Sequence, residues 1–297
     1  MVHEAAQGAA VNTPGGSCAS GGVHAGSILI GKTLLPALLV CLGIVVLYPL
    51  VWMVLNGFKD NALIFGQPFA LPTHWNWGNY VQAWNQGVRD YLTVSILVTA
   101  TSGLCTVLIS AWTAYGLTRS RMPLKPLATG LVLGGLMLSP TVALIPLVKM
   151  LQALGLYNTY WALIVLYTAF RVPFATFLIR AWMLDLPRDL DEAASMDGAT
   201  EGQIFWRIIL PLCRPIIISC VILHVLFAWN EYLFAMIFTS GADMQTLPVG
   251  LTSIMARHGT NYAVVFAAMS LSALPMVGVF FAAQRYFIRG LAEGIGK

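Results

Sequence analysis

Charged residues are scarce in this chain. Lysine, arginine, aspartate and glutamate supply 9% of its 297 residues, against roughly 25% in an ordinary soluble domain, and 58% of the residues are hydrophobic. A water-soluble fold of this size has too little polar surface to cover so much apolar material. The composition therefore excludes an ordinary soluble protein and predicts a protein built for lipid. The formal net charge of +4 is small, so the positions of the charges carry more information than their sum.

Cysteine and the residue sets of metal sites and enzymes are also sparse. The five cysteines form no CxxC pair and no cluster with histidine, which predicts neither a zinc site nor a disulfide framework. We interpret them as small buried hydrophobes. No HExxH, no paired acidic motif and no Ser/His/Asp set at one interface supports a membrane enzyme. We therefore expect no catalytic residue, no metal and no cofactor. The cysteines are Cys18, Cys41, Cys105, Cys213 and Cys220.

Long apolar runs take the place of the missing charge. A helix needs about 20 apolar residues to cross ~30 Å of hydrocarbon. Six segments meet this requirement, and we predict an all-α polytopic membrane protein with six transmembrane helices. The segments are residues 29–56, 94–117, 127–148, 156–179, 212–238 and 261–283.

The positions of lysine and arginine predict the orientation. Cytoplasmic loops are enriched in these residues. With the N-terminus inside, eleven of them fall on the cytoplasmic side and four on the outer side, with Arg171 left inside a span, so both termini are predicted to be cytoplasmic. The inner set is Lys32, Arg119, Arg121, Lys125, Arg180, Arg188, Arg207, Arg214, Arg285, Arg289 and Lys297; the outer set is Lys59, Arg89, Lys149 and Arg257.

Two segments flank the first span. Residues 1–28 are rich in Gly, Ala and Ser and have no basic start, which predicts a disordered cytoplasmic tail and not a signal peptide. The outer loop, residues 57–93, carries Trp75, Trp77, Tyr80 and Trp84. Such aromatic residues are typical of the membrane interface. A surface that binds an external partner is the alternative reading.

The run from Gly26 to Thr33 matches the phosphate-loop pattern GxxxxGK[ST]. That loop works only between a buried strand and a helix of an α/β domain, where free backbone amides surround the phosphates. Here a predicted disordered tail precedes the match and a predicted span begins inside it. We interpret the match as coincidence and Lys32 as the cytoplasmic flank of the first span.

The cytoplasmic segment between the fourth and fifth spans has a helix–turn–helix pattern. Pro187 suits a first helical turn, and a helix can run from there to about Met196. Gly198 permits a left-handed turn, and Thr200 with Gln203 forms a capping-box pattern that starts a second helix. A first helix of about ten residues is marginal alone. Spacing leaves two readings open: a helix that inserts into a partner's groove, or an interfacial helix that joins two spans.

This segment resembles the EAA loop of ABC importer permeases. The run Glu192-Ala193-Ala194-Ser195-Met196-Asp197-Gly198-Ala199 carries the likeness, which is closest to the carbohydrate-uptake subfamily typified by the second, six-span permease of the maltose importer. Three further stretches are similar to that subfamily in order and spacing, so that the resemblance runs from about Lys32 to the C-terminus. They are Trp229-Asn230-Glu231-Tyr232-Leu233-Phe234-Ala235, Thr246-Leu247-Pro248-Val249-Gly250-Leu251 and Gln284-Arg285-Tyr286-Phe287-Ile288-Arg289-Gly290-Leu291.

The resemblance implies a function and a set of partners. Residues 29–297 would be the permease domain of a binding-protein-dependent importer in a bacterial inner membrane. It would pair with a homologous second permease and with a dimer of ATPase subunits that bind the nucleotide. An extracellular solute-binding protein would deliver a sugar, and nucleic acid would have no part. The residues implied in coupling to the ATPase are Asp191, Glu192, Ala193, Ala194, Asp197 and Gly198.

Polar residues inside the predicted spans are candidates for the substrate path, since ionisable groups are rare in lipid. Tyr167, Thr168 and Arg171 share one helix face, and Asn230 and Glu231 lie near the outer end of the fifth span. Arg171 stands where the subfamily more often has a neutral residue. Helical rise places Arg171 ~14 Å and Glu231 ~26 Å above the cytoplasmic side, which disfavours a direct ion pair. We therefore favour contact between Arg171 and an acidic sugar over a structural pair with Glu231.

Other polar groups and other functions remain as alternatives. His224 is read as a satisfied packing residue, and Glu231 alternatively as a structural hydrogen-bond anchor. A self-contained secondary transporter or channel is the rival function, and the proline-broken stretches around Pro140 and Pro146 suit one. A coupled carrier usually has more carboxylates inside its spans, however, and would leave the EAA-like loop without a purpose.

Overall fold

The computed structural model describes residues 23–120, 123–241, 244–257 and 261–295, and across these ranges it contains helices and no strand. The predicted all-α class is confirmed. Two compact units make up the chain, Met1–Val51 and Trp52–Lys297. The helix α1 (Val23–Gly57) supplies the described part of the first unit.

The start of α1 bears on two predictions. The helix begins at Val23, within the last residues of the predicted disordered tail, whereas residues 1–22 lie outside the described residues. The stretch from Gly26 to Thr33 is helical throughout. A helix does not offer the loop of free amides that a phosphate loop requires, so the structure agrees with a coincidental match.

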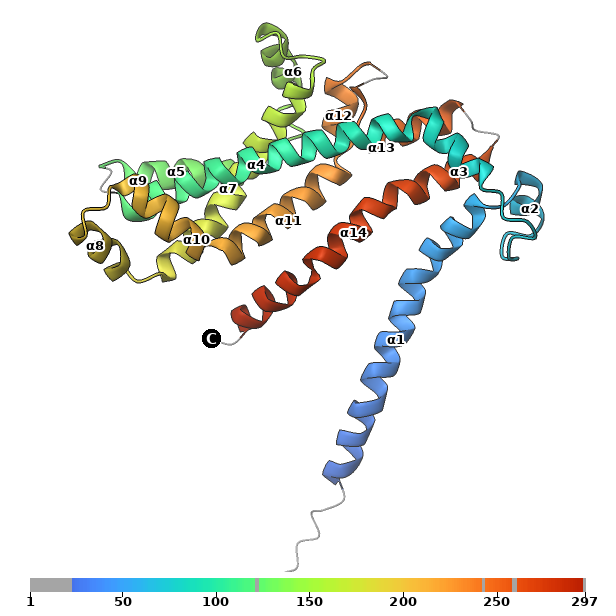
Figure 1. Ribbon diagram of the computed structural model, residues 1–297, viewed down its shortest axis with the longest axis horizontal. Helices are drawn as coiled ribbons and strands as arrows, with labels where there is room; N and C mark the ends of the chain where they lie inside the picture. The colour runs from blue at the N-terminus through green and yellow to red at the C-terminus, as the bar shows by residue number, and fades with distance from the viewer. Residues whose placement is uncertain (1–22, 121–122, 242–243, 258–260, 296–297) are drawn as a thin grey trace, which may run out of the picture. The chain divides into compact units, whose positions relative to one another are not determined.

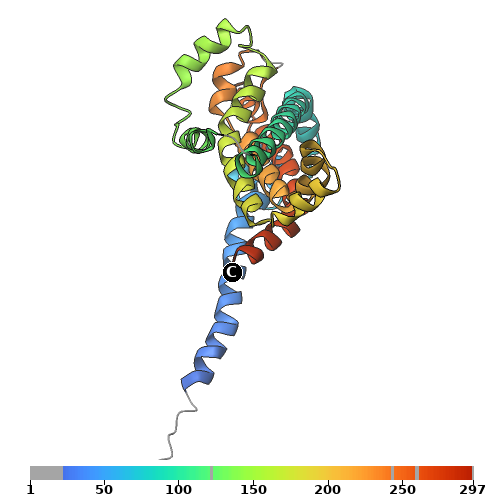
Figure 2. The same ribbon diagram turned by 90° about the vertical axis from the view of Figure 1, so that its left-hand side faces the viewer.

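Two long helices form the centre of the second unit, α4 (Arg89–Arg119) and α7 (Tyr160–Asp185). They pack against each other along most of their length, as both views show (Figures 1 and 2). The buried face of α4 is rich in small residues, which let helix backbones approach closely in membranes. Two hydroxyls donate to backbone carbonyls across the contact: Ser110 to that of Val172 and Thr168 to that of Ser102. The small buried residues of α4 are Ser95, Thr99, Ser102, Gly103, Thr106, Ser110, Ala111, Ala114 and Thr118.

The remaining helices pack around this pair. The helix α11 (Arg214–Asn230) contacts α4, α7 and α14 (Tyr262–Ile295). Beyond the C-terminal end of α11, α12 (Leu233–Phe238) joins an apolar cluster with α4 and α7. The helix α13 (Leu247–Arg257) packs against α14 and the start of α4.

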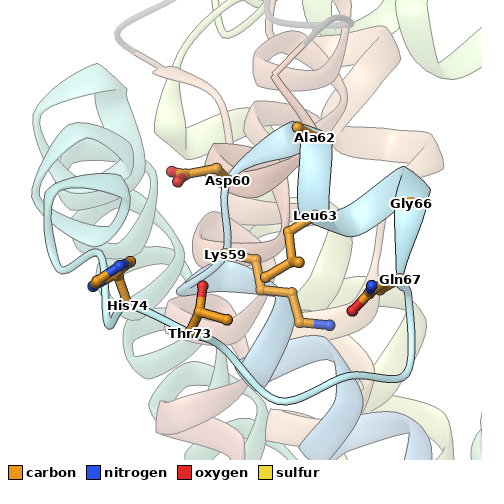
Figure 3. A pocket seen from close by; sticks show the side chains of 8 residues that line it. All are labelled: Lys59, Asp60, Ala62, Leu63, Gly66, Gln67, Thr73 and His74. Carbon is orange, nitrogen blue, oxygen red and sulfur yellow. The ribbon is translucent and has the colours of Figure 1, made fainter.

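The segment between α1 and α4, predicted to be an outer loop, is partly helical, with α2 (Asn61–Gly66), α3 (Gly78–Ala83) and the π-helical turn η1 (Trp84–Val88). The carbonyl oxygen of Pro68 accepts hydrogen bonds from Trp52 Nε1 and Lys59 Nζ, both at 2.9 Å. These bonds tie the loop to the end of α1. In Figure 3 the buried Lys59 side chain points in the direction of Gln67, beside a pocket of about 320 Å³. Burial lowers the pKa of the Lys59 ammonium from its ordinary value.

The third predicted span is not one helix. Residues 127–148 divide between α5 (Lys125–Gly135) and α6 (Leu144–Ala153), and the prediction of a single helix there is wrong. Pro140 lies in the break, and a proline removes a helical hydrogen bond and clashes with the preceding turn. The fifth predicted span is likewise divided, since α11 ends at Asn230 and α12 begins at Leu233.

Four helices of the described residues are long and apolar enough to cross a membrane, or five if a helix pair bent by 74° counts as one span. That pair joins residues 201–212 to α11. The chain is thus a multi-pass membrane protein, and the count of six spans stays a prediction.

One close approach between α13 and the start of α4 gives a test of this packing. A Cβ atom added at Gly250 in α13 would overlap the ring of Tyr91 in α4. We expect Gly250→Ala to lower stability by about 1–3 kcal/mol, the usual cost of overpacking. This loss of stability would be measured as a lower unfolding temperature of the purified variant in detergent. The matched control is Gly278→Ala in α14, where no atom lies within 4 Å of the added Cβ. Equal unfolding temperatures for the two variants would contradict this packing.

Candidate coupling site and substrate path

The helix α8 (Asp189–Met196) is the first helix of the EAA-like segment. It begins two residues after Pro187, slightly later than predicted, and ends at Met196 as predicted. Its first turn carries Asp189, Asp191 and Glu192. Acidic side chains are favourable there because the N-terminus of a helix carries partial positive charge.

The turn after α8 has the predicted chemistry. Gly198 has φ +82°, a left-handed conformation that side-chain-bearing residues resist. Thr200 then caps α9 (Glu201–Ile204): its backbone amide donates to Gln203 Oε1 at 2.9 Å, and the Gln203 amide donates to Thr200 Oγ1 at 3.4 Å. The chain continues through the π-helical turn η2 (Phe205–Ile209) and α10 (Leu210–Leu212). The predicted helix, glycine turn and second helix are confirmed.

The two faces of α8 differ in what they contact. Ala194 is buried in an apolar cluster with residues of α4, α7 and η2, and Asp191 turns to the same side. Glu192, Ala193, Asp197 and Gly198 are exposed. Met196 is 89% exposed. Of the six residues implied in coupling, four therefore lie free for a partner and two face the permease itself.

Arg119, the last residue of α4, holds α8 in place. Its Nη1 lies 3.0 Å from Asp191 Oδ2, and its Nη2 donates to the carbonyls of Leu186 at 2.9 Å and Met183 at 3.3 Å. The side chain of Arg119 is 7% exposed and that of Asp191 20%. Burial raises the pKa of the Asp191 carboxyl, and the guanidinium opposes that rise. Sequence reasoning placed Arg119 only as a cytoplasmic flank; its position at the end of a span was the one available signal.

The candidate residues of the substrate path do not form one group. Tyr167 is fully buried and donates to Glu231 Oε2 at 2.8 Å. The same carboxylate accepts from the backbone amides of Phe234 at 2.8 Å and Ala235 at 3.1 Å, at the start of α12. This geometry favours the structural-anchor reading of Glu231. Thr168 faces α4, as described above.

Arg171 lies apart from Glu231. Its guanidinium carbon is 5.0 Å from the ring centroids of both Phe174 and Phe227, and Nη2 donates to the Leu223 carbonyl at 3.3 Å. Within the described part of the chain it forms no ion pair. The half-buried cation is thus held by aromatic faces, which attract cations.

Asn230 and His224 complete the polar set. Asn230 lines a pocket of about 410 Å³ with Trp229 of α11, Pro248 of α13 and Ser272 of α14. His224 is buried, and its Nε2 lies 2.8 Å from Ser102 Oγ. The reading of His224 as a packing residue with a polar partner agrees with this contact. Asn230 is the one candidate path residue that lines this pocket.

The family of the chain follows from comparison with known proteins. The model of the family described as binding-protein-dependent transport system inner membrane component matches residues 106–293. The chain belongs to this family. It is 44% identical over 268 residues to the probable ABC transporter permease protein YurM of Bacillus subtilis, covering 90% of this chain and 89% of that protein.

Two further comparisons extend the match. The chain is 33% identical over 263 residues to the trehalose/maltose transport system permease protein MalG of Thermococcus litoralis, covering 87% of this chain and 94% of MalG. A bacterial ABC transporter involved in the import of the acidic polysaccharide alginate has a chain of the same fold, with a TM-score of 0.79, 22% identity, and coverage of 93% of this chain and 100% of that one. The predicted resemblance to ABC importer permeases of the carbohydrate-uptake subfamily is confirmed.

The turn and the exposed face of α8 give a test of the coupling assignment. Gly198→Val forces a β-branched residue into a left-handed conformation, at a cost of order 1–3 kcal/mol. Glu192→Lys reverses a charge on the exposed face. We expect both variants to insert into the membrane normally and to lose transport or association with ATPase subunits, measured by uptake and by co-purification.

The control for the turn is Gly202→Val. Gly202 lies in α9, has no positive φ and has open space around its Cα, so the same added volume carries no backbone strain of that kind. Normal transport by both Gly198→Val and Glu192→Lys would show that the coupling assignment is wrong.

Proposed function

We propose that this chain is the permease subunit of an ATP-driven importer and forms half of a translocation path for a sugar or oligosaccharide. The observation that carries the proposal is the two-sided α8. One face is anchored in the permease by Asp191 and Ala194, and the other offers Glu192, Ala193 and Met196 to a partner. An amphipathic helix presented in this way suits a groove on a second protein.

The proposal includes the partners that this architecture needs. ATP hydrolysis takes place on a dimer of separate nucleotide-binding subunits, into which α8 docks. A homologous second permease supplies the other half of the path, and an extracellular solute-binding protein delivers the sugar. Both termini face the cytoplasm of a bacterial cell. The sugar class is supported by the relatives, of which MalG is named for trehalose and maltose.

Purification of the assembled complex tests this function. We expect that an affinity tag on this chain, expressed in its own cells, recovers an ATPase subunit and a second permease. The ATPase activity of the recovered complex should rise when the solute-binding protein and sugar are added. The rival reading, a self-contained secondary transporter or channel, predicts uptake by the chain alone in vesicles without ATP. Uptake of that kind would reject the proposal.

Arg171 bears on the class of sugar. Its guanidinium carbon lies 5.0 Å from the ring centroids of Phe174 and Phe227, Nη2 donates to the Leu223 carbonyl, and no carboxylate of the described residues forms an ion pair with it. A charge held this way inside a span is costly unless it meets water or an anion. We propose that the substrate supplies the anion, as an acidic oligosaccharide containing a uronate would.

Reconstituted vesicles can separate this role from a structural one. We expect Arg171→Gln to lose uptake of an acidic oligosaccharide and to keep uptake of a neutral one, and Arg171→Lys to retain part of the acidic uptake because it keeps the charge. Equal loss of both, with a less stable complex, would indicate a structural cation–aromatic contact. Unchanged uptake of both would reject the substrate contact.

A further inference from the structure

The cytoplasmic end of α4 holds both halves of the coupling segment. Arg119 binds Asp191 of α8, as described above, and the Tyr115 hydroxyl donates to the carbonyl of Glu201 in α9 at 3.4 Å. The rings of Trp112 and Tyr115 pack on Phe205, with centroids 5.6 and 5.1 Å away. About two turns of α4, from Trp112 to Arg119, therefore hold α8, the glycine turn and α9.

Arg119 is the residue of this stretch that joins the most elements. The same guanidinium binds Asp191 of α8 and caps the carbonyls of Met183 and Leu186 at the end of α7. A planar guanidinium has donors in a fixed fork, so these bonds restrict one another's geometry. The Arg119 guanidinium therefore links α8 to the adjacent ends of α4 and α7.

The opposite end of α4 holds α13 at both of its ends. Ser95 Oγ accepts from the amide of Leu247, the first residue of α13, at 2.7 Å. The Tyr91 hydroxyl accepts from Nη2 of Arg257, the last residue of α13, also at 2.7 Å. Tyr91 and Ser95 are four residues apart and so share a face of α4. The close approach of Gly250 to the Tyr91 ring fixes the middle of α13 against the same face.

The helix between these two ends is suited to transmit movement. It has 31 residues and no proline, which gives a length of ~46 Å at 1.5 Å per residue. Proline is one common cause of a sharp kink in a helix, and α4 contains no proline. Figure 1 shows α8 and α9 near one end of α4 and α3 near the other.

We propose that Arg119 is a positioning residue for coupling, that Asp191 serves this internal joint and not the contact with the ATPase, and that α4 carries the displacement of α8 to α13. The inference rests on the proposed function, since it assumes that an ATPase subunit moves α8. It gives the two faces of α8 different roles. Glu192, Ala193 and Met196 bind the ATPase, and Asp191 transmits the displacement of α8 to α4 through Arg119.

The experiment measures transport per ATP hydrolysed by the complete complex in vesicles, together with the amount of ATPase subunit that co-purifies. We expect Asp191→Asn to keep the ATPase bound and hydrolysing while sugar transported per ATP falls by about tenfold or more. Asp191→Glu, which keeps the carboxylate, should restore most of the ratio. Asp90→Asn makes the same chemical change at an exposed carboxylate in the first turn of α4 and is the matched control, with the ratio unchanged.

A double-mutant cycle tests whether Asp191 acts through Arg119. If Arg119 and Asp191 act through one joint, Arg119→Gln combined with Asp191→Asn is no worse than the more severe single variant, because coupled residues are not additive. Effects that multiply, or loss of the ATPase subunit from Asp191→Asn alone, would show that Asp191 contacts the ATPase and would overturn the proposal. Since Asp191 is partly exposed, its variant carries the test even if Arg119→Gln fails to fold.

Variants at the opposite end of α4 test whether this helix transmits the displacement. Tyr91→Phe together with Ser95→Ala removes both acceptors for α13, and we expect this variant also to lower transport per ATP with the ATPase still bound. A normal ratio would overturn transmission through α4. The wild-type complex separates this inference from the proposed function: absence of any ATPase from the wild-type preparation contradicts the function, whereas a normal ratio in the variants contradicts only the joint.

Discussion

The contact between α4 and α7 is the one on which the other helices depend. Lipid tails are as apolar as leucine, so helices in a membrane associate through close packing and local satisfaction of polar groups. The small residues of α4 meet both conditions. Ser102 and Thr118 donate back to the carbonyls of Val98 and Ala114, at 2.6 and 2.8 Å, and so place little polar demand on α7. The result is a closely packed pair of helices to which α11, the EAA-like segment and α13 are attached.

Local features could be predicted well because their causes lie within a few residues. The left-handed Gly198 and the Thr200–Gln203 capping box depend on the backbone of one turn and on side chains three positions apart. The prediction of the third span as one helix was wrong because it rested on composition and not on local backbone chemistry. Hydropathy counts apolar residues and is insensitive to a break, so the run around Pro140 has the composition of a span although α5 and α6 form two helices.

Contacts between distant parts of the chain could not be predicted from the sequence. Arg119 was predicted only to lie at the cytoplasmic side, and which acid it binds depends on how α8 folds back on α4. The depth estimate correctly disfavoured an ion pair between Arg171 and Glu231. It could not show that Glu231 ends a helix and binds Tyr167, because the estimate assumed one unbroken helix through that position.

The division of α8 into two faces has a consequence for how such proteins diverge. The anchoring positions, Asp191 and Ala194, are constrained by contacts within the same chain. Glu192, Ala193 and Met196 are exposed and are not constrained in this way. Substitutions on the second face can therefore change the exposed surface of α8 without disturbing its contacts within the chain. If the exposed face binds an ATPase subunit as proposed, a few changes on one side of this eight-residue helix would alter which subunit binds, while the contacts of Asp191 and Ala194 within the chain would be kept.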